Sequence, residues 1–185
     1  MAQENNANIM ERTVDTKRVF DGLILHIDHV TNVLPNGKTA AREIARHVGA
    51  SAVVPVDGEG NVWLVKQFRA PLDRVLLEIP AGKLDDREED RLEAAKRELR
   101  EETGLTAASW THLGDIVTTP GFSDEKISLY LARELSAGES HPDEDEFLNV
   151  VRVPLGELTA MIMRGEVPDS KTICAVLMAD RVVNG

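Results

Sequence analysis

The sequence predicts an α/β domain in which a mixed β-sheet lies between helices. Three observations carry this prediction: strand-like segments dominate the middle of the chain, one segment with helical spacing interrupts them, and two more helical segments follow. The 185 residues suffice for one domain with a short extension, and 42% hydrophobic with 29% charged residues is typical of a globular protein. We expect a flexible N-terminal arm over residues 1–16, which lack apolar periodicity, and a single domain over residues 17–185.

The predicted strands are apolar segments bounded by turn residues. The loop of residues 57–61, Asp-Gly-Glu-Gly-Asn, is typical of a hairpin that joins two of these segments. The strand candidates are residues 19–30, 51–56, 62–68, 74–79, 111–117, 126–132 and 147–153.

The predicted helices are marked by spacing and by their ends. Residues 90–103 have one apolar face, and Gly104 follows as a C-terminal stop. Pro154 suits the first turn of a helix that runs to residue 164, and Asp169 or Ser170 can cap a last helix that ends near residue 182.

Charge and hydropathy exclude several classes of protein. With 21 Lys and Arg against 32 Asp and Glu, the net charge of −11 repels nucleic acid and anionic membranes. We find no apolar run of the roughly 18 residues that a membrane span needs and no signal-peptide pattern, so we expect a cytoplasmic protein. The single cysteine, Cys174, stands among apolar neighbours and is expected in the core.

A group of glutamates lies within the predicted helix of residues 90–103. With about 100° of rotation per residue and Glu98 taken as zero, Glu102 lies at about 40° and Glu101 at about 300°, so Glu98 and Glu102 border the apolar stripe. Like charges at this spacing beside a core need a compensating cation. Mg²⁺ suits them because it prefers carboxylate oxygens and is usually completed by substrate phosphates. The competing interpretation is a solvated, charged helix face.

The full spacing of this stretch resembles the Nudix box, G-x5-E-x7-R-E-U-x-E-E-x-G-U, in which U is a bulky aliphatic residue. The match is complete from Arg97 to Leu105, and Glu89 lies seven intervening residues before Arg97. Six residues rather than five separate Gly82 from Glu89, so either the loop holds an insertion or Glu88 takes the first glutamate's place. The resemblance implies a Nudix-type α/β/α sandwich with a mixed β-sheet between helices.

Flanking segments are similar to the ADP-ribose pyrophosphatase branch of this family: residues 64–69, residues 77–82 and Pro120, which stands sixteen residues after Gly104. The resemblance implies metal-dependent hydrolysis of ADP-ribose or a related nucleoside diphosphate sugar to a nucleoside monophosphate and a sugar phosphate, and it favours a homodimer. One alternative is hydrolysis of GDP-mannose or another sugar nucleotide. The other is a non-catalytic Nudix sensor that binds ADP-ribose.

Carried over to this chain, the resemblance implies a metal site made by Glu98 and Glu102, with Glu101 close enough to share an ion. The main-chain carbonyl of Ala81 is the matching backbone ligand. Mg²⁺ is the expected metal, with Mn²⁺ as a substitute. Arg97 and Glu89 are expected to form a structural pair that fixes the loop against the helix.

The resemblance also implies residues that hold the substrate. Arg69 corresponds to an arginine that binds diphosphate, a role that suits a planar guanidinium. Arg42 and Glu43 resemble a pair near the nucleoside end, and Glu78 is expected either close to the site or in a salt bridge with a neighbouring arginine. Because residues 21–62 contain no Phe, Trp or Tyr that could stack on the base, other residues must do so. The candidates are Phe20, Phe122, His26 and His47.

Hydrolysis needs a group that orients or deprotonates the attacking water, and a glutamate can do this. In the branch that this chain resembles, the group comes from a loop after the box, where residues 142–147 are acidic. Glu146 is the first candidate and Glu144 the second, with Glu101 as a further candidate beside the metal.

Overall fold

The computed structural model describes residues 6–138 and 147–185, which divide into two compact units. The main unit comprises Val48–Thr118 and Lys126–Gly185, and the N-terminal unit comprises the chain up to His47 together with Thr119–Glu125. Glu144 and Glu146 lie outside the described residues. No helix in the described part of the chain is both long enough and apolar enough to cross a membrane.

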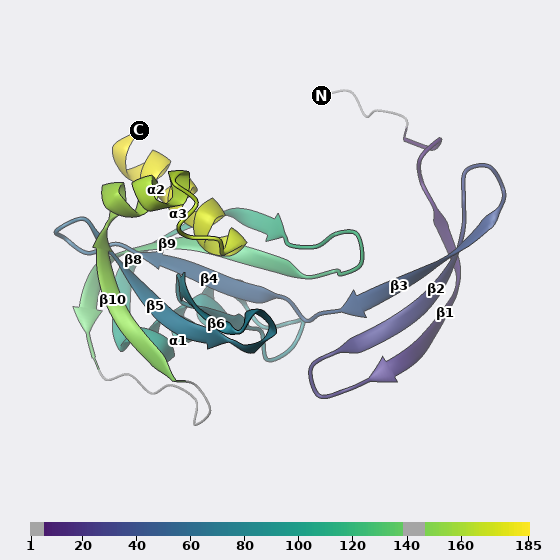
Figure 1. Ribbon diagram of the computed structural model, residues 1–185, viewed down its shortest axis with the longest axis horizontal. Coiled ribbons are helices and arrows are strands. Elements are labelled where there is room, and N and C mark those ends of the chain that lie inside the picture. The colour runs from purple at the N-terminus through teal and green to yellow at the C-terminus, as the bar shows by residue number, and fades with distance from the viewer. Residues whose placement is uncertain (1–5, 139–146) are drawn as a thin grey trace. The chain divides into compact units, whose positions relative to one another are not determined.

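A four-stranded mixed sheet forms the centre of the main unit (Figure 1). Its strand order is β7-β4-β9-β8, and the parallel pair β4 and β9 stands between antiparallel neighbours. The strands are β4 (Ala50–Pro55), β7 (Ala81–Lys83), β8 (Leu105–Val117) and β9 (Lys126–Ala137).

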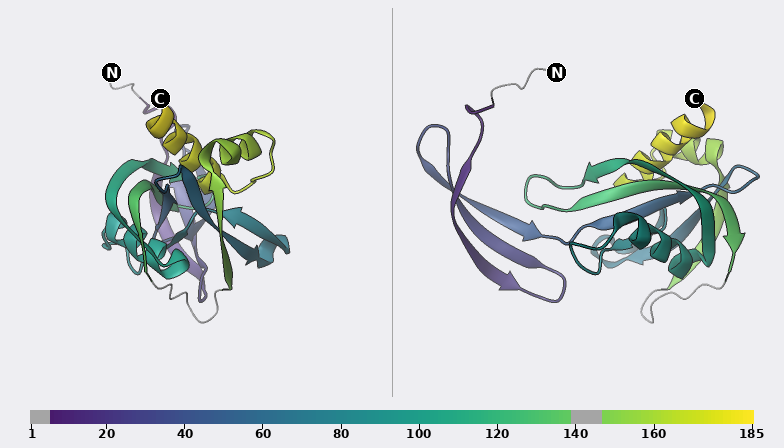
Figure 2. Two further views of the ribbon diagram at one scale, coloured as in Figure 1. Left: turned by 90° about the vertical axis from the view of Figure 1, so that its left-hand side faces the viewer. Right: turned by 180° about the vertical axis from the view of Figure 1, so that it is seen from behind.

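Helices cover both faces of this sheet, as Figure 2 shows. Because successive strand residues point to opposite faces, Val53 of β4 packs with Leu99 of α1 (Arg91–Thr103), while Val54 belongs to a second cluster. That cluster includes residues of α2 (Leu155–Met163) and α3 (Ser170–Asn184), and Cys174 packs against it. The predicted α/β fold, with a mixed sheet between helices, is confirmed.

A second sheet in the main unit has the order β10-β5-β6, all antiparallel. Its strands are β5 (Asn61–Arg69), β6 (Arg74–Glu78) and β10 (Leu148–Pro154), and the 3₁₀ turn η1 (Ala70–Leu72) joins the first two. The predicted hairpin between residues 51–56 and 62–68 is wrong beyond its turn. Asp57 closes the turn by accepting from the backbone N–H of Asn61 at 2.9 Å. The two segments are then paired only by one antiparallel bridge, Val56 to Val62, because β4 pairs with β9 and β7 instead.

The helix ends follow the sequence signals. The Asp90 carboxylate accepts from the backbone N–H of Leu92 at 2.9 Å and begins α1, and Gly104, with φ of 71°, ends it. Asp169 caps α3 by accepting from the backbone N–H of Thr172 at 3.0 Å. Pro154 stands at the N-cap of α2.

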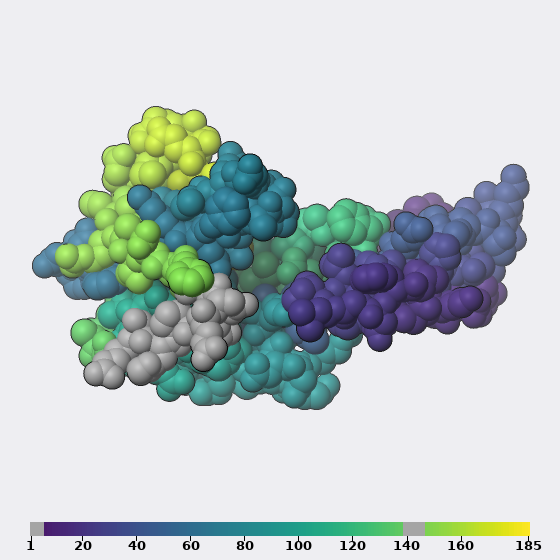
Figure 3. All heavy atoms as spheres, turned by 60° about the horizontal axis from the view of Figure 1, so that its bottom comes forward, coloured from purple at the N-terminus to yellow at the C-terminus, as the bar shows by residue number. Residues whose placement is uncertain are grey.

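The N-terminal unit is built on an antiparallel sheet, β1-β2-β3, of β1 (Arg12–Asp21), β2 (His26–Val33) and β3 (Thr39–Arg46). Every residue of β1 is exposed, and this strand forms part of the purple surface in Figure 3. In the same unit, the backbone N–H of Ala45 donates to the carbonyl of Phe122 at 2.7 Å, which joins residues 119–125 to β3.

One predicted strand in this unit is wrong. Residues 19–30 are not a single strand, because the chain reverses at Gly22, whose N–H donates to the Leu25 carbonyl at 2.9 Å. The apolar residues 23–25 are exposed at this turn, and the reversal allows β1 and β2 to pair. Since β1 begins at Arg12, it overlaps the expected arm over residues 1–16, and the division of the chain at residue 17 stays a prediction.

Candidate active site

Two buried glutamates of α1 face the backbone that enters β7. Glu98 is 8% exposed and Glu102 is 4% exposed, and they lie one turn apart on either side of Leu99, which anchors the helix in the core. The Glu102 carboxylate accepts from the backbone N–H of Ala81 at 3.3 Å. The packing of Leu99 thus holds both carboxylates against one short segment.

The Glu98 carboxylate occupies the place where a side chain at position 82 would lie. A Cβ atom built on Gly82 would be 2.1 Å from Oε1 and 2.4 Å from Oε2 of Glu98. Only glycine allows this approach. The residue type at position 82 is therefore fixed by the position of a glutamate sixteen residues later in the helix.

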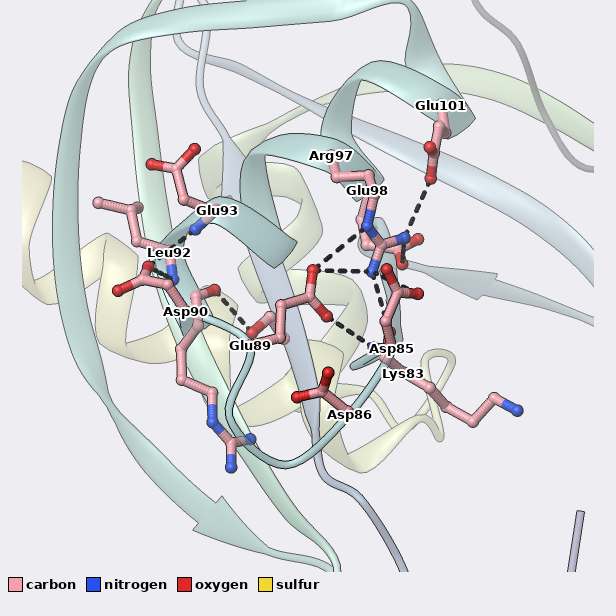
Figure 4. Close-up of polar contacts among 12 residues, drawn as sticks. Lys83, Asp85, Asp86, Glu89, Asp90, Leu92, Glu93, Arg97, Glu98 and Glu101 are labelled. Atoms are coloured by element: carbon pink, nitrogen blue, oxygen red, sulfur yellow. Dashed lines mark hydrogen bonds and ion pairs between the residues drawn. The ribbon is translucent and has the colours of Figure 1, made fainter.

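Arg97 supplies the nearby positive charge and links the helix to the preceding loop (Figure 4). Its Nη1 donates to Glu98 at 2.7 Å and to Glu101 at 3.2 Å, and its Nη2 donates to the Lys83 carbonyl at 3.1 Å and to Glu89 at 3.4 Å. Burial lowers the pKa of Arg97, but the charges of Glu98 and Glu89 outweigh burial and raise it above its usual value. The guanidinium therefore stays charged while it holds two helix carboxylates.

The loop before α1 resolves the choice between Glu88 and Glu89. The Glu89 carboxylate accepts from Arg97 and also from the backbone N–H of Asp85 at 2.6 Å, whereas Glu88 is exposed and its backbone N–H donates to Asp86. Glu89, and not Glu88, is thus the glutamate that contacts Arg97, as expected for the structural pair.

A cavity of about 320 Å³ adjoins this cluster. It is lined by Gly82, Lys83, Leu84, Asp85, Arg97, Glu98 and Glu101. Within the described part of the chain, no three His, Cys, Asp or Glu side chains already converge as a metal centre would require. The donors nevertheless fit a hard cation, because carboxylate oxygens and backbone carbonyl oxygens are the ligands that Mg²⁺ and similar ions prefer.

Arg69 and Glu78 form a bidentate ion pair across β5 and β6. Nε and Nη2 of Arg69 each donate to one Glu78 oxygen at 2.7 Å, so the salt bridge expected as one of two roles for Glu78 is present. Hydrogen bonding to Glu78 raises the pKa of Arg69, and the negative charge of Glu102 adds to this effect. Arg69 therefore lies within electrostatic reach of Glu102.

Glu78 is 1% exposed and has a second cationic partner, Lys171 of α3. Burial raises the pKa of Glu78, but hydrogen bonding to Arg69 and the charge of Lys171 lower it below its usual value overall. The Thr172 hydroxyl accepts from the backbone N–H of Ile79 at 2.9 Å and donates to Asp169 at 2.6 Å. No local sequence signal indicates this contact of Lys171, because β6 and α3 are far apart along the chain.

The remaining candidates lie in the N-terminal unit. Arg42 donates to Glu11 and to the Ala41 carbonyl, and it lines a pocket of about 340 Å³. The other lining residues are Glu11, Asn32, Ile44, Arg46 and residues 120–124, which include Pro120 and Phe122. Glu43 is the next residue on β3 and its carboxylate contacts His29 at 3.1 Å, so the expected Arg42–Glu43 pair points to opposite faces of the sheet.

The possible stacking residues have separate surroundings in this unit. Phe20 and Phe122 are both exposed, and Phe122 lines the same pocket as Arg42. His26 contacts Asp21 at 2.6 Å, and His47 lies 3.6 Å from Glu125. Phe122 is therefore the aromatic residue that the structure brings together with Arg42.

Comparison with known proteins identifies relatives over most of the chain. A family model described as NUDIX domain matches residues 45–176. An ADP-ribose pyrophosphatase of Bacillus subtilis (strain 168) is 44% identical over 91% of this chain and 92% of the relative. An ADP-ribose pyrophosphatase of Mycobacterium tuberculosis is 38% identical over 100% of this chain and 88% of the relative.

Two further matches also cover most of the chain. A methanol dehydrogenase activator of Bacillus methanolicus is 42% identical over 90% of each chain. The crystal structure of an ADP compounds hydrolase superposes with a TM-score of 0.83 over 96% of each chain. At 22% identity, this last likeness concerns the fold.

Proposed function

This chain is a Nudix hydrolase, a member of the NUDIX domain family, and from that premise we propose that it hydrolyses the diphosphate bond of ADP-ribose or a related nucleoside diphosphate sugar. Water attacks one phosphorus atom, the bridging P–O bond breaks, and the products are a nucleoside monophosphate and a sugar phosphate. The observation that carries the proposal is the pair of buried carboxylates, Glu98 and Glu102, held against the Ala81–Gly82 backbone, where Glu98 also lines an open cavity.

Nudix hydrolases need divalent metal ions, and we propose Mg²⁺, with Mn²⁺ as a substitute, for this chain. Glu98, Glu102, Glu101 and the Ala81 carbonyl are the proposed ligands. When bound, the ion supplies charge neutralisation at the diphosphate. Arg97 already binds Glu98 and Glu101, so it fixes where these carboxylates lie.

The other proposed roles belong to residues that hold substrate or move a proton. Arg69 orients the diphosphate, because its guanidinium is fixed by Glu78 and lies within electrostatic reach of Glu102. Glu146, Glu144 and Glu101 remain the candidates for accepting the proton of the attacking water. The first two lie outside the described residues, and Glu101 lies beside the cavity.

Substrate identity depends on residues outside the box. We propose Arg42 and Phe122 for the nucleoside end, since a cation and an exposed aromatic ring line one pocket of the N-terminal unit. The experiment is a panel of ADP-ribose, ADP-glucose, GDP-mannose and diadenosine polyphosphates, with Mg²⁺ and with a chelator, scored by kcat/KM. Preference for ADP-ribose supports the proposal, preference for GDP-mannose favours the alternative, and binding of ADP-ribose without hydrolysis of any compound favours a sensor.

Glu98→Gln and Glu102→Gln test the role of the carboxylates. Each substitution keeps the size of the side chain and removes its charge, so we expect turnover to fall by at least about a hundredfold while the protein remains folded by circular dichroism. Exposed Glu93→Gln on the same helix is the matched control and keeps its activity. Normal turnover in both Glu98→Gln and Glu102→Gln contradicts the proposal.

We further propose that the chain forms a homodimer and is cytoplasmic. The support for a dimer is that all ten residues of β1 are exposed, including the apolar Val14, Val19 and Phe20. Apolar exposure on an edge strand of this length is typical of a surface that pairs with another chain.

A further inference from the structure

We propose that Lys171, on the C-terminal helix α3, positions Arg69 for diphosphate binding by sharing the buried carboxylate of Glu78. This inference rests on the proposed function, because it assigns a residue to the binding of the diphosphate. Lys171 lies 93 residues from Glu78 in sequence and belongs to no motif of the box.

The contacts define a carboxylate that two cations hold in common. Oε1 of Glu78 accepts from Nε of Arg69, while Oε2 accepts both from Nη2 of Arg69 and from Nζ of Lys171. Lys171 also contacts Asp169, the N-cap of α3, at 3.1 Å. The Lys171 side chain is 12% exposed, so it is committed to this network.

The arrangement leaves one part of Arg69 for another acceptor. A guanidinium that gives its Nε edge to a carboxylate retains both N–H groups of Nη1. The Arg69 side chain is 38% exposed, in contrast to the buried Glu78. The carboxylate therefore fixes the orientation of the guanidinium plane, while a phosphoryl oxygen can accept from the accessible part.

Lys171 also sets the charge that Arg69 presents. Alone, Arg69 and Glu78 would form a neutral pair with little attraction for a diphosphate. The second cation on Glu78 offsets the carboxylate, and the N-terminal dipole of α3 offsets part of the charge of Asp169. Glu78 therefore neutralises less of the positive charge of Arg69 than the bidentate geometry alone would suggest.

The same network has a structural role, which the test must separate from positioning. Thr172, the next residue, joins Asp169 to the backbone of Ile79 through its hydroxyl. Loosening of α3 would lower stability whether or not Lys171 acts on Arg69. A double-mutant cycle separates the two roles, since an effect that passes through Arg69 disappears once Arg69 is removed.

The experiment measures binding of inorganic pyrophosphate in the presence of Mg²⁺ by calorimetry for wild type, Lys171→Met, Arg69→Met and the double variant. We expect Lys171→Met to weaken binding about tenfold in the wild-type background and less than twofold in the Arg69→Met background. Lys171→Arg, which keeps the charge, restores most of the affinity. Lys171→Gln, which keeps a donor without the charge, replaces Lys171→Met if that variant does not fold.

Lys126→Met is the matched control, because it removes another lysine–carboxylate pair of the main unit, at 2.7 Å from Asp115, and leaves Glu78 untouched. It should bind pyrophosphate as wild type does. With ADP-ribose as substrate, Lys171→Met should raise KM more than it lowers kcat. Equal losses from Lys171→Met in both backgrounds, or wild-type affinity in Lys171→Met, would overturn the inference.

The outcomes also separate this inference from the proposed function. A wild-type protein that binds pyrophosphate but hydrolyses no sugar nucleotide refutes the proposed function, while the cycle still decides the role of Lys171. A protein that hydrolyses ADP-ribose and is indifferent to Lys171→Met refutes the inference alone.

Discussion

Gly82→Ala is the substitution whose effect follows most directly from the geometry of the site. The added Cβ would lie 2.1 Å from Oε1 of Glu98, so that oxygen would have to retreat by roughly 1 Å to reach 3.0 Å. The backbone at Gly82 needs no left-handed conformation, and the three atoms nearest to the added Cβ all belong to the Glu98 carboxylate. The substitution therefore displaces a carboxylate without removing it.

The expected loss is large for activity and small for stability. A displacement of about 1 Å in a group that must be aligned costs on the order of a hundredfold in rate, and altered support of a metal ligand costs about 10–100-fold in metal affinity. Replacing glycine by alanine gains about 0.4–1 kcal/mol through the unfolded chain, which offsets part of the cost of moving Glu98. We expect kcat/KM to fall about a hundredfold, the Mg²⁺ activation constant to rise, and Tm to change by only a few degrees.

Gly58→Ala is the matched control for this experiment. Nothing lies within 4 Å of a Cβ at Gly58, and its loop joins β4 to β5 in the same unit. This control should keep wild-type kinetics. The reasoning is refuted if Gly82→Ala keeps the wild-type kcat/KM and Mg²⁺ activation constant, because Glu98 would then be free to move without consequence.

Two further predictions concern stability and assembly. Hydrogen bonding to Lys126, with smaller contributions from Ser128 and His112, outweighs burial and lowers the pKa of Asp115 to about 2, from 3.8. After allowance for its partial exposure, Asp115→Asn should lose about 1–2 kcal/mol of unfolding free energy at pH 7. Because the pKa of Asp115 is lower in the folded than in the unfolded state, its charge stabilises the fold fully above about pH 4, and this stabilisation is lost as pH falls to about 2. In urea titrations, the difference in unfolding free energy between wild type and Asp115→Asn should therefore shrink over this range. A constant difference contradicts the assignment. Sedimentation of the wild type should show a dimer, and Val19→Asp, which puts a charge on exposed β1, should dissociate it. A monomeric wild type refutes the dimer.

The elements that could be predicted are those whose signals are local. The cap at Asp90, the stop at Gly104 and the apolar stripe around Leu99 fix α1, and with it the relative positions of Glu98 and Glu102. The box spacing likewise indicated a contact between Arg97 and Glu89, and the structure contains it. Short-range sequence order is enough for these features because one helix holds most of the participants.

The features that could not be predicted depend on pairing across the fold. β3 was missed because it consists mainly of alanines and charged residues, so the strand exists through pairing with β2 rather than through propensity. β7 has three residues and depends on β4. Residues 23–25 read as strand but are an exposed turn. Lys171 reaches Glu78 only because α3 packs near β6, which no local pattern records.

The two glutamate substitutions should differ in stability, because the two carboxylates have different kinds of contact. Glu98 has a 2.7 Å ion pair with Arg97, and the Glu102 carboxylate accepts from the backbone N–H of Ala81 at 3.3 Å. A glutamine keeps an oxygen that can accept from a backbone N–H, but it lacks the charge that attracts a guanidinium. With a chelator present, we therefore expect Glu98→Gln to melt below Glu102→Gln, although neither turns over substrate. The reverse order would mean that the charge of Glu102 contributes more to the stability of the fold than the ion pair of Glu98 with Arg97.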